Sequence, residues 1–174
     1  MMTNKVQNLT LTALMAAVLC IAGPLVIPIG VVPISLINMA LYLAIILLDK
    51  KSAVMSTIIY LLIGFIGLPV FSGFTGGAGK ILGPTGGYLV GYLVLIWVAG
   101  SIMEKRRKGY IPAFIAGTLG LYLFGTFWLM YQSGIDFITA LSIGVIPFIP
   151  FDMGKILAAV FLGNAMKKRM RNMV

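Results

Sequence analysis

Apolar stretches long enough to cross a lipid bilayer follow one another along almost the whole chain, and this feature limits the possible folds more than any other. A helix needs about 20 mostly apolar residues to span about 30 Å of hydrocarbon. Of the 174 residues, 60% are hydrophobic and only 10% are charged, whereas a soluble domain is about half apolar and a quarter charged. The sequence therefore predicts an all-α integral membrane protein and excludes a soluble globular domain.

Charged residues, prolines and glycines divide the chain into six predicted transmembrane spans. These spans are Leu9–Ile29, Val31–Leu48, Ser52–Leu68, Pro84–Met103, Tyr110–Met130 and Pro150–Met166. The apolar stretch Phe137–Ile149 and the last span are together too long for one crossing. Because Pro147 and Pro150 lack amide donors, we expect a break near Pro150, with Phe137–Ile149 forming a short helix or re-entrant segment. Residues 1–174 are thus expected to form a single six-helix domain.

The distribution of charge predicts the orientation of these spans. The formal net charge is +9, and basic residues collect in the cytoplasmic loops of membrane proteins. All but two of the 13 lysines and arginines fall on one side of the predicted spans, so we expect both termini to be cytoplasmic. Because the positive charge is explained by this orientation, we do not expect the chain to bind nucleic acid. The two exceptions are Lys80, in an external loop, and Lys155, inside the last span.

The composition also excludes several kinds of chemistry. Histidine is absent and Cys20 is the only cysteine, so the chain can form neither an internal disulfide nor a Cys/His metal site. Gly79-Lys80 lies in a glycine-rich loop, but Phe74 and Ile81 occupy the positions where a phosphate-binding loop needs Gly and Ser/Thr. We therefore predict no metal, no cofactor, no catalytic residue and no ATP site, so the energy for any transport must come from other subunits.

Asp152 and Lys155 are the most informative polar residues in the sequence. Residues three apart share one face of a helix, and an ionised side chain at membrane depth costs about 2.5–3.5 kcal/mol on insertion scales. The pair should therefore face protein or water rather than lipid. Two interpretations of the pair remain open. Either the two side chains contact a ligand, or they form a structural ion pair in which Asp152 also caps the start of the helix.

Small residues indicate where helices or ligands can approach a backbone closely. Gly83, Gly87 and Gly91 recur at every fourth position, which suits either close helix packing or contact with a ligand. Ala13 and Ala17 form a weaker pair of the same spacing, which suits either internal packing or docking of a partner subunit.

Aromatic residues cluster around the glycine-rich external loop. Phe71 and Phe74 lie within it, and Tyr88 lies one turn into the following span. Aromatic residues are common at membrane interfaces, but Tyr88 lies beside the glycine face. An external, largely apolar cavity with a flexible lid and one acid–base pair is typical of a site for a small, mostly apolar molecule.

The segment GPTGGYLVG, residues 83–91, resembles the signature of the biotin-specific substrate-capture subunits of energy-coupling-factor (ECF) vitamin transporters. Further blocks resemble that family in the expected order, namely Val32–Leu36, Pro69–Gly73 and Pro147–Lys155. The resemblance implies the ECF S-component fold with six helices. It also implies capture of biotin from outside the cell and delivery with a membrane coupling subunit and two cytoplasmic ATPases. The sequence departs from the family at Ile37-Asn38, where the family commonly has Gln.

The resemblance further implies roles for individual residues. Asp152 and Lys155 are expected to bind the polar groups of biotin. Tyr88 and Phe74 are expected to form apolar walls, with the loop before Gly83 as the lid. The expected substrate-binding residues are Asp152, Lys155, Tyr88, Phe74, Gly87, Thr85 and Phe71. Ala13 and Ala17 are expected to contact the coupling subunit.

Other functions fit the sequence less well. An S-component for another vitamin is the nearest alternative. A membrane enzyme would need more acid–base groups than four acidic residues without histidine provide. A small channel would need polar residues along several spans, and the first five predicted spans have almost none.

Overall fold

The computed structural model describes residues 5–27, 32, 34–105 and 109–172, and this part of the chain is almost entirely helical. The helices are α1 (Lys5–Ala22), α2 (Ile37–Leu47), α3 (Lys50–Phe65), α4 (Ala78–Leu82), α5 (Gly86–Lys105), α6 (Tyr110–Ser133), α7 (Phe137–Gly144), the 3-10 helix η1 (Ile146–Phe148) and α8 (Ile149–Asn172). Two short strands, β1 (Val26–Ile27) and β2 (Ile34–Ser35), form an antiparallel pair. The prediction of a helical fold is confirmed.

Within the described part of the chain, four helical segments are long and apolar enough to cross a membrane. They are Lys5–Ala22, Gly86–Lys105, Tyr110–Ser133 and Phe137–Arg169. Helices α3 and α2 are apolar too, but they have only 16 and 11 residues. Each of the six predicted spans therefore overlaps one helix, although two of these helices are shorter than a full crossing.

The predicted span Val31–Leu48 is wrong at its start. Helix α2 begins only at Ile37, because β2 pairs with β1 instead of joining the helix. The Ile37 amide donates to the Ser35 hydroxyl at 3.2 Å, which satisfies one of the free donors at the helix start. The strand pair was missed because two apolar strands this short look like helix in a hydropathy window.

The first predicted span extends too far. Helix α1 ends at Ala22, and the predicted end at Ile29 lies outside the described residues. The chain leaves the helix at Gly23-Pro24, where proline disfavours helical backbone at the residue before it. The Gly23 amide still donates to the Leu19 carbonyl at 2.9 Å, so the helix is completed before the turn.

The predicted break before the last helix is confirmed. Helix α7 ends at Gly144, and Val145 leaves the helical conformation with φ −133° and ψ −56°. The turn η1 contains Pro147, and α8 then begins at Ile149. Pro150 lies in the first turn of α8, where its missing amide costs no hydrogen bond.

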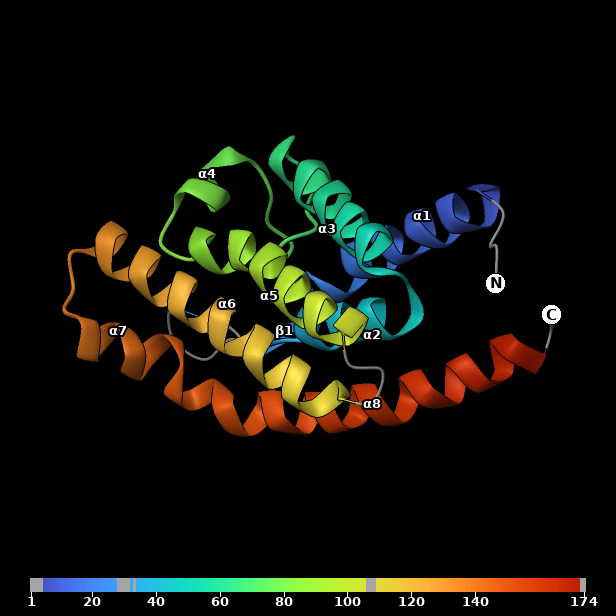
Figure 1. The fold of residues 1–174 in the computed structure, drawn as a ribbon. Coiled ribbons are helices and arrows are strands. Elements are labelled where there is room, and N and C mark those ends of the chain that lie inside the picture. The colour runs from blue at the N-terminus through green and yellow to red at the C-terminus, as the bar shows by residue number, and fades with distance from the viewer. Residues whose placement is uncertain (1–4, 28–31, 33, 106–108, 173–174) are drawn as a thin grey trace.

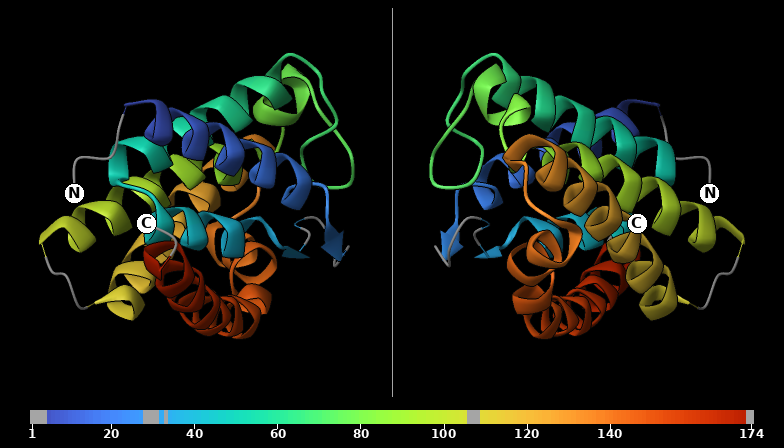
Figure 2. Two further views of the ribbon diagram at one scale, coloured as in Figure 1. Left: turned by 90° about the vertical axis from the view of Figure 1, so that its right-hand side faces the viewer. Right: turned by 90° about the vertical axis from the view of Figure 1, so that its left-hand side faces the viewer.

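Helices α5 and α6 make the most extensive contact in the bundle. Figure 1 shows α8 running along α6, and α1 and α3 on the other side of α5. Helix α2 contacts both α8 and α5. The start of α1 and the end of α8 lie at one end of the bundle, whereas α4 and α7 lie at the other end (Figure 1). Figure 2 shows the β1–β2 pair at the edge of the molecule.

Candidate functional site

Asp152 and Lys155 form a buried ion pair at the start of α8. Asp152 lies in the first turn of the helix and is 3% exposed. The Lys155 Nζ lies 2.7 Å from Oδ1 of Asp152, and the Lys155 side chain is 10% exposed. The expectation that these two charges share a face and turn inward is confirmed.

Two further helices donate hydrogen bonds to the same carboxylate. The Tyr122 hydroxyl of α6 donates to Oδ2 of Asp152 at 2.6 Å. The Asn38 side-chain amide of α2 donates to the same oxygen at 3.1 Å. Both oxygens of Asp152 are therefore engaged by donors from α2, α6 and α8. Such charge-assisted bonds offset the cost of burying the charge.

The pattern of donors argues against a capping role for Asp152. A capping carboxylate accepts a bond from a backbone amide in the first helical turn. Asp49 and Asp136 do so at the starts of α3 and α7, from the amides of Ser52 and Thr139. Within the described ranges, every hydrogen bond to Asp152 comes instead from a side chain.

The ion pair lines a small pocket between α2, α5, α6 and α8. Its volume is about 50 Å³, whereas small-molecule sites usually measure about 300–1,000 Å³. The lining residues are Val32, Ser35, Asn38, Tyr88, Tyr92, Leu121, Tyr122, Gly144, Phe148, Asp152 and Lys155. In this conformation the pocket must widen to admit a molecule of vitamin size.

Four of the eleven residues that line the pocket are aromatic, and three of these four are tyrosines with hydroxyl groups. The Tyr88 hydroxyl donates to the Gly144 carbonyl at 3.1 Å, which ties α5 to the end of α7. Tyr92, one turn further along α5, is buried, and its hydroxyl has no hydrogen-bond partner in the part of the chain that the structure describes. The pocket therefore combines apolar ring surface with an available phenol group.

Of the seven predicted substrate-binding residues, Asp152, Lys155 and Tyr88 line this pocket and the other four lie outside its lining. Phe71 is fully buried and meets the Tyr60 ring edge-on, with ring centres 5.6 Å apart. Phe74 is 68% exposed on the loop before α4. The two loop phenylalanines thus differ, since one anchors the loop and the other points outward.

The glycine signature packs helices together at the start of α5. A Cβ added at Gly87 would lie 2.2 Å from Cβ of Trp128 on α6, so only glycine fits there. The Trp128 indole donates to the Gly83 carbonyl at 2.9 Å. Thr85 is half-buried, and its carbonyl accepts a bond from the Tyr88 amide at 3.2 Å. The signature therefore fixes the position from which Tyr88 reaches the pocket.

Ala13 and Ala17 lie on an exposed face of α1. The opposite face buries Thr12, Met15, Ala16 and Leu19, where α1 packs against α3 and α2. Because both alanines are exposed within the single chain, the alternative of internal packing does not apply to them.

The sequence analysis assigned no site role to three residues that shape the pocket, namely Asn38, which it noted only as a departure from the family, Tyr92 and Tyr122. Each lies within an apolar helix, where a polar side chain is expected to face protein rather than lipid. Asn38 with Tyr42 and Tyr88 with Tyr92 are spaced four residues apart, which places each pair on one helix face. That spacing could have identified the polar sides of α2 and α5.

Comparisons with known proteins cover almost the whole chain. The family model described as the BioY family matches residues 1–172. Biotin transporter BioY2 from Lactococcus lactis subsp. cremoris (strain MG1363) is 36% identical over 169 residues, which are 95% of this chain and 93% of that protein. Biotin transporter BioY from Thermotoga maritima is 34% identical over 164 residues, which are 93% of this chain and 96% of that protein.

The fold is also similar to that of a solved structure. A crystal structure of the S-component for biotin from an ECF-type ABC transporter superposes with a TM-score of 0.87 at 36% identity. The match covers 97% of this chain and 95% of that one. The protein is a multi-pass protein of the cell membrane, and the extent of these matches shows that the chain belongs to the BioY family.

Proposed function

We propose that this chain is the biotin-binding subunit of an ECF-type uptake transporter, and that it captures biotin from outside the cell. The observation that supports this most strongly is the buried Asp152–Lys155 pair, which forms part of a pocket lined by aromatic side chains. The relatives are named biotin transporters, and the structural neighbour is named an S-component for biotin. A transport subunit of this kind is not an enzyme.

The hydrogen-bonding capacity of the pair suits the ureido ring of biotin. A carboxylate offers about four acceptor sites and an ammonium group about three donors, and the structure engages three acceptor sites and one donor. Asp152 therefore has an acceptor site left for an N–H of the ureido ring, and Lys155 has N–H donors left for its C=O group. The valerate carboxylate of biotin has only acceptors, and the Asp152 charge would repel it.

The other contacts are assigned by whether each residue lines the pocket. Tyr88 and Tyr92 form the wall against the fused rings of biotin. Phe74, which is exposed, contacts biotin only after the loop before α4 has closed over the site. Phe71, Thr85 and Gly87 lie outside the pocket lining, so they contribute by holding the loop and the start of α5 in place.

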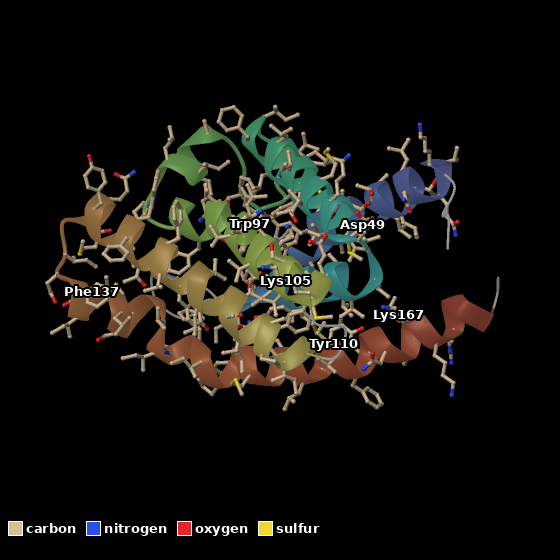
Figure 3. The ribbon with its side chains drawn as sticks, viewed as in Figure 1. Asp49, Trp97, Lys105, Tyr110, Phe137 and Lys167 are labelled. Carbon is tan, nitrogen blue, oxygen red and sulfur yellow. The ribbon has the colours of Figure 1, made fainter. Side chains whose placement is uncertain are left out.

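We propose a single domain of six spans with both termini in the cytoplasm. The ends of α1 and α8 that carry Lys5 and Lys167 lie at the same end of the bundle (Figure 1). Lys105 at the end of α5 lies near the middle of the view in Figure 3, well away from Phe137 on α7. Helix α2 covers only roughly 16 Å by itself, so the β1–β2 pair completes its path to the external side.

Transport requires partners, because the sequence has no nucleotide-binding motif. We propose that a membrane coupling subunit docks on the exposed Ala13/Ala17 face of α1 and that two cytoplasmic ATPases supply the energy. Small side chains at this spacing let a second helix approach closely. The exposure of both alanines in the single chain supports this assignment.

Retention of radiolabelled biotin by the purified chain tests the proposal. The protein should bind one biotin per chain and release it chemically unchanged. Excess riboflavin or thiamine should not displace the bound biotin. Displacement by another vitamin would identify a different S-component. Conversion of biotin to a product, or no binding by folded protein, would refute the proposed function.

A further inference from the structure

A second and larger pocket lies near the end of the bundle where α8 finishes. Its volume is about 220 Å³. The lining residues are Ile45, Ile46, Leu48, Asp49, Lys50, Gly100, Met103, Glu104, Tyr110 and Lys167. Lys167 is twelve residues along α8 from Lys155, which is roughly 18 Å of helix. The two pockets share no lining residue, so the biotin site does not account for this one. Figure 3 shows that three of its residues, Asp49, Tyr110 and Lys167, lie far from Phe137 on α7.

The rim of this second pocket carries charges of both signs. Lys50 Nζ lies 3.5 Å from Oε2 of Glu104, and the Glu104 side chain is 59% exposed. Because exposed ion pairs are weak, a charged ligand can replace either partner of this one. The Asp49 carboxylate is already occupied by the amide and hydroxyl of Ser52. Lys167 has no carboxylate within 4.0 Å in the described ranges. A ligand here meets two cations and one readily available carboxylate.

Aromatic residues place the pocket at the level of the lipid headgroups. Trp97 is 60% exposed on α5, and Lys50 Nζ lies 5.4 Å from the centre of its ring. Tyr110, at the start of α6, lines the pocket itself. Tryptophan and tyrosine gather at the boundary between membrane and water. The inner wall, by contrast, is apolar, with Ile45 and Met103 among its residues.

We propose that this pocket binds the headgroup of an ethanolamine phospholipid. The phosphate would contact Lys50 and Lys167, and the ammonium group would contact Glu104. A purely anionic headgroup would leave Glu104 without a cation once Lys50 turned to the phosphate. A choline headgroup has no N–H to donate to Glu104, so it would leave that carboxylate without a hydrogen-bond donor. The arrangement therefore favours ethanolamine over glycerol or choline headgroups.

Native mass spectrometry of the purified full chain tests this proposal without any dependence on biotin. Delipidated protein is mixed with equal amounts of dioleoyl phosphatidylethanolamine, phosphatidylglycerol and phosphatidylcholine. We expect one phosphatidylethanolamine per chain, retained about fivefold more than either other lipid. Lys167→Gln and Glu104→Gln should each remove this preference. Lys51→Gln is the matched control, because Lys51 is exposed next to Lys50 but does not line the pocket.

The outcomes separate headgroup recognition from other sources of lipid binding. Displacement of the lipid by soluble glycerophosphoethanolamine, but not by glycerophosphoglycerol, supports recognition of the headgroup. Equal retention of all three lipids, a preference for phosphatidylglycerol, or an equal loss in Lys51→Gln would overturn the proposal. Lipid that neither soluble headgroup displaces would be held by its acyl chains, which also overturns it. Size-exclusion profiles establish that each variant is folded.

Discussion

The Tyr122 hydroxyl donates a hydrogen bond of 2.6 Å to Oδ2 of Asp152, across 30 residues of sequence. This contact joins the middle of α6 to the first turn of α8 at the floor of the pocket. Since Lys155 binds the other carboxylate oxygen, Tyr122 holds Asp152 from the opposite side. The orientation of the acid therefore depends on a helix that supplies no charge of its own.

Substitution of Tyr122 by Phe should weaken biotin binding. The change removes one donor to a buried carboxylate, and hydrogen bonds to charged groups contribute about 1.5–3 kcal/mol. We expect the Kd for biotin to rise about 10- to 100-fold, measured by titration calorimetry in detergent. The matched control is Tyr42→Phe, because the Tyr42 hydroxyl pairs with Thr118 at 2.6 Å and not with Asp152. Equal losses of affinity in the two variants would argue against this role for Tyr122.

Gly87→Ala should destabilise the contact between α5 and α6. The new methyl group would lie 2.2 Å from Cβ of Trp128, whose indole is tied to the Gly83 carbonyl. Overpacking of this kind costs about 1–3 kcal/mol, so the Tm in detergent should fall. Gly154→Ala is the control, because no described side chain or neighbouring helix lies within 4 Å of its added Cβ and alanine favours helix. A Tm for Gly87→Ala at or above wild type would show that the helices separate easily.

Asp49 should stabilise the start of α3 in a pH-dependent way. Burial raises the pKa of its carboxyl, but hydrogen bonds from the Ser52 hydroxyl and amide outweigh this and lower the pKa below 3.8. The stabilisation is therefore present above the ordinary pKa and is lost as pH falls through the lowered value. Loss of an N-cap costs about 1 kcal/mol, so Asp49→Ala should unfold at lower temperature than wild type at neutral pH.

A series of melting curves from neutral pH to about pH 3 checks the Asp49 prediction. The gap between wild type and Asp49→Ala should narrow as the carboxyl becomes protonated. Asp49→Asn provides the control, because asparagine caps a helix about as well as aspartate but does not titrate. A gap that stays constant across this range would show that the charge contributes nothing at the helix start.

Bulky residues on the exposed face of α1 should block assembly with the coupling subunit. Ala13→Trp and Ala17→Trp fill the space that a neighbouring helix would occupy. Tagged protein with either change should recover much less coupling subunit and ATPase from membranes, while biotin binding stays normal. Leu157→Trp, at a 57% exposed position on α8, is the matched control. Undiminished recovery with all three variants would place the docking face elsewhere.

The apolar pattern predicted most helices because hydropathy and breaking residues act locally. Helix α6 begins at Tyr110 as predicted, and α8 begins one residue before the predicted Pro150. The Asp152–Lys155 pair was also predictable, since a spacing of three places both side chains on one face. Strand pairing within the chain caused the error at α2, because β1 pairs with Ile34 and Ser35, two residues that the apolar pattern assigned to the helix.

Long-range contacts within the site could not be predicted in this way. Asn38 lies 114 residues from Asp152, and no local pattern indicates which helices will meet. Phe71 and Phe74 looked equivalent in the sequence, yet one is buried against Tyr60 and the other is exposed. Their difference arises from the fold of the loop, which depends on the packing of α3.

The central claim is that Asp152 and Lys155 bind biotin directly, and equilibrium biotin binding to charge variants tests it best. Asp152→Asn and Lys155→Met each leave one buried charge unpaired, whereas the double variant leaves neither and should remain folded. We predict that all three lose biotin affinity by at least about 100-fold. Wild-type affinity in the folded double variant would contradict the claim.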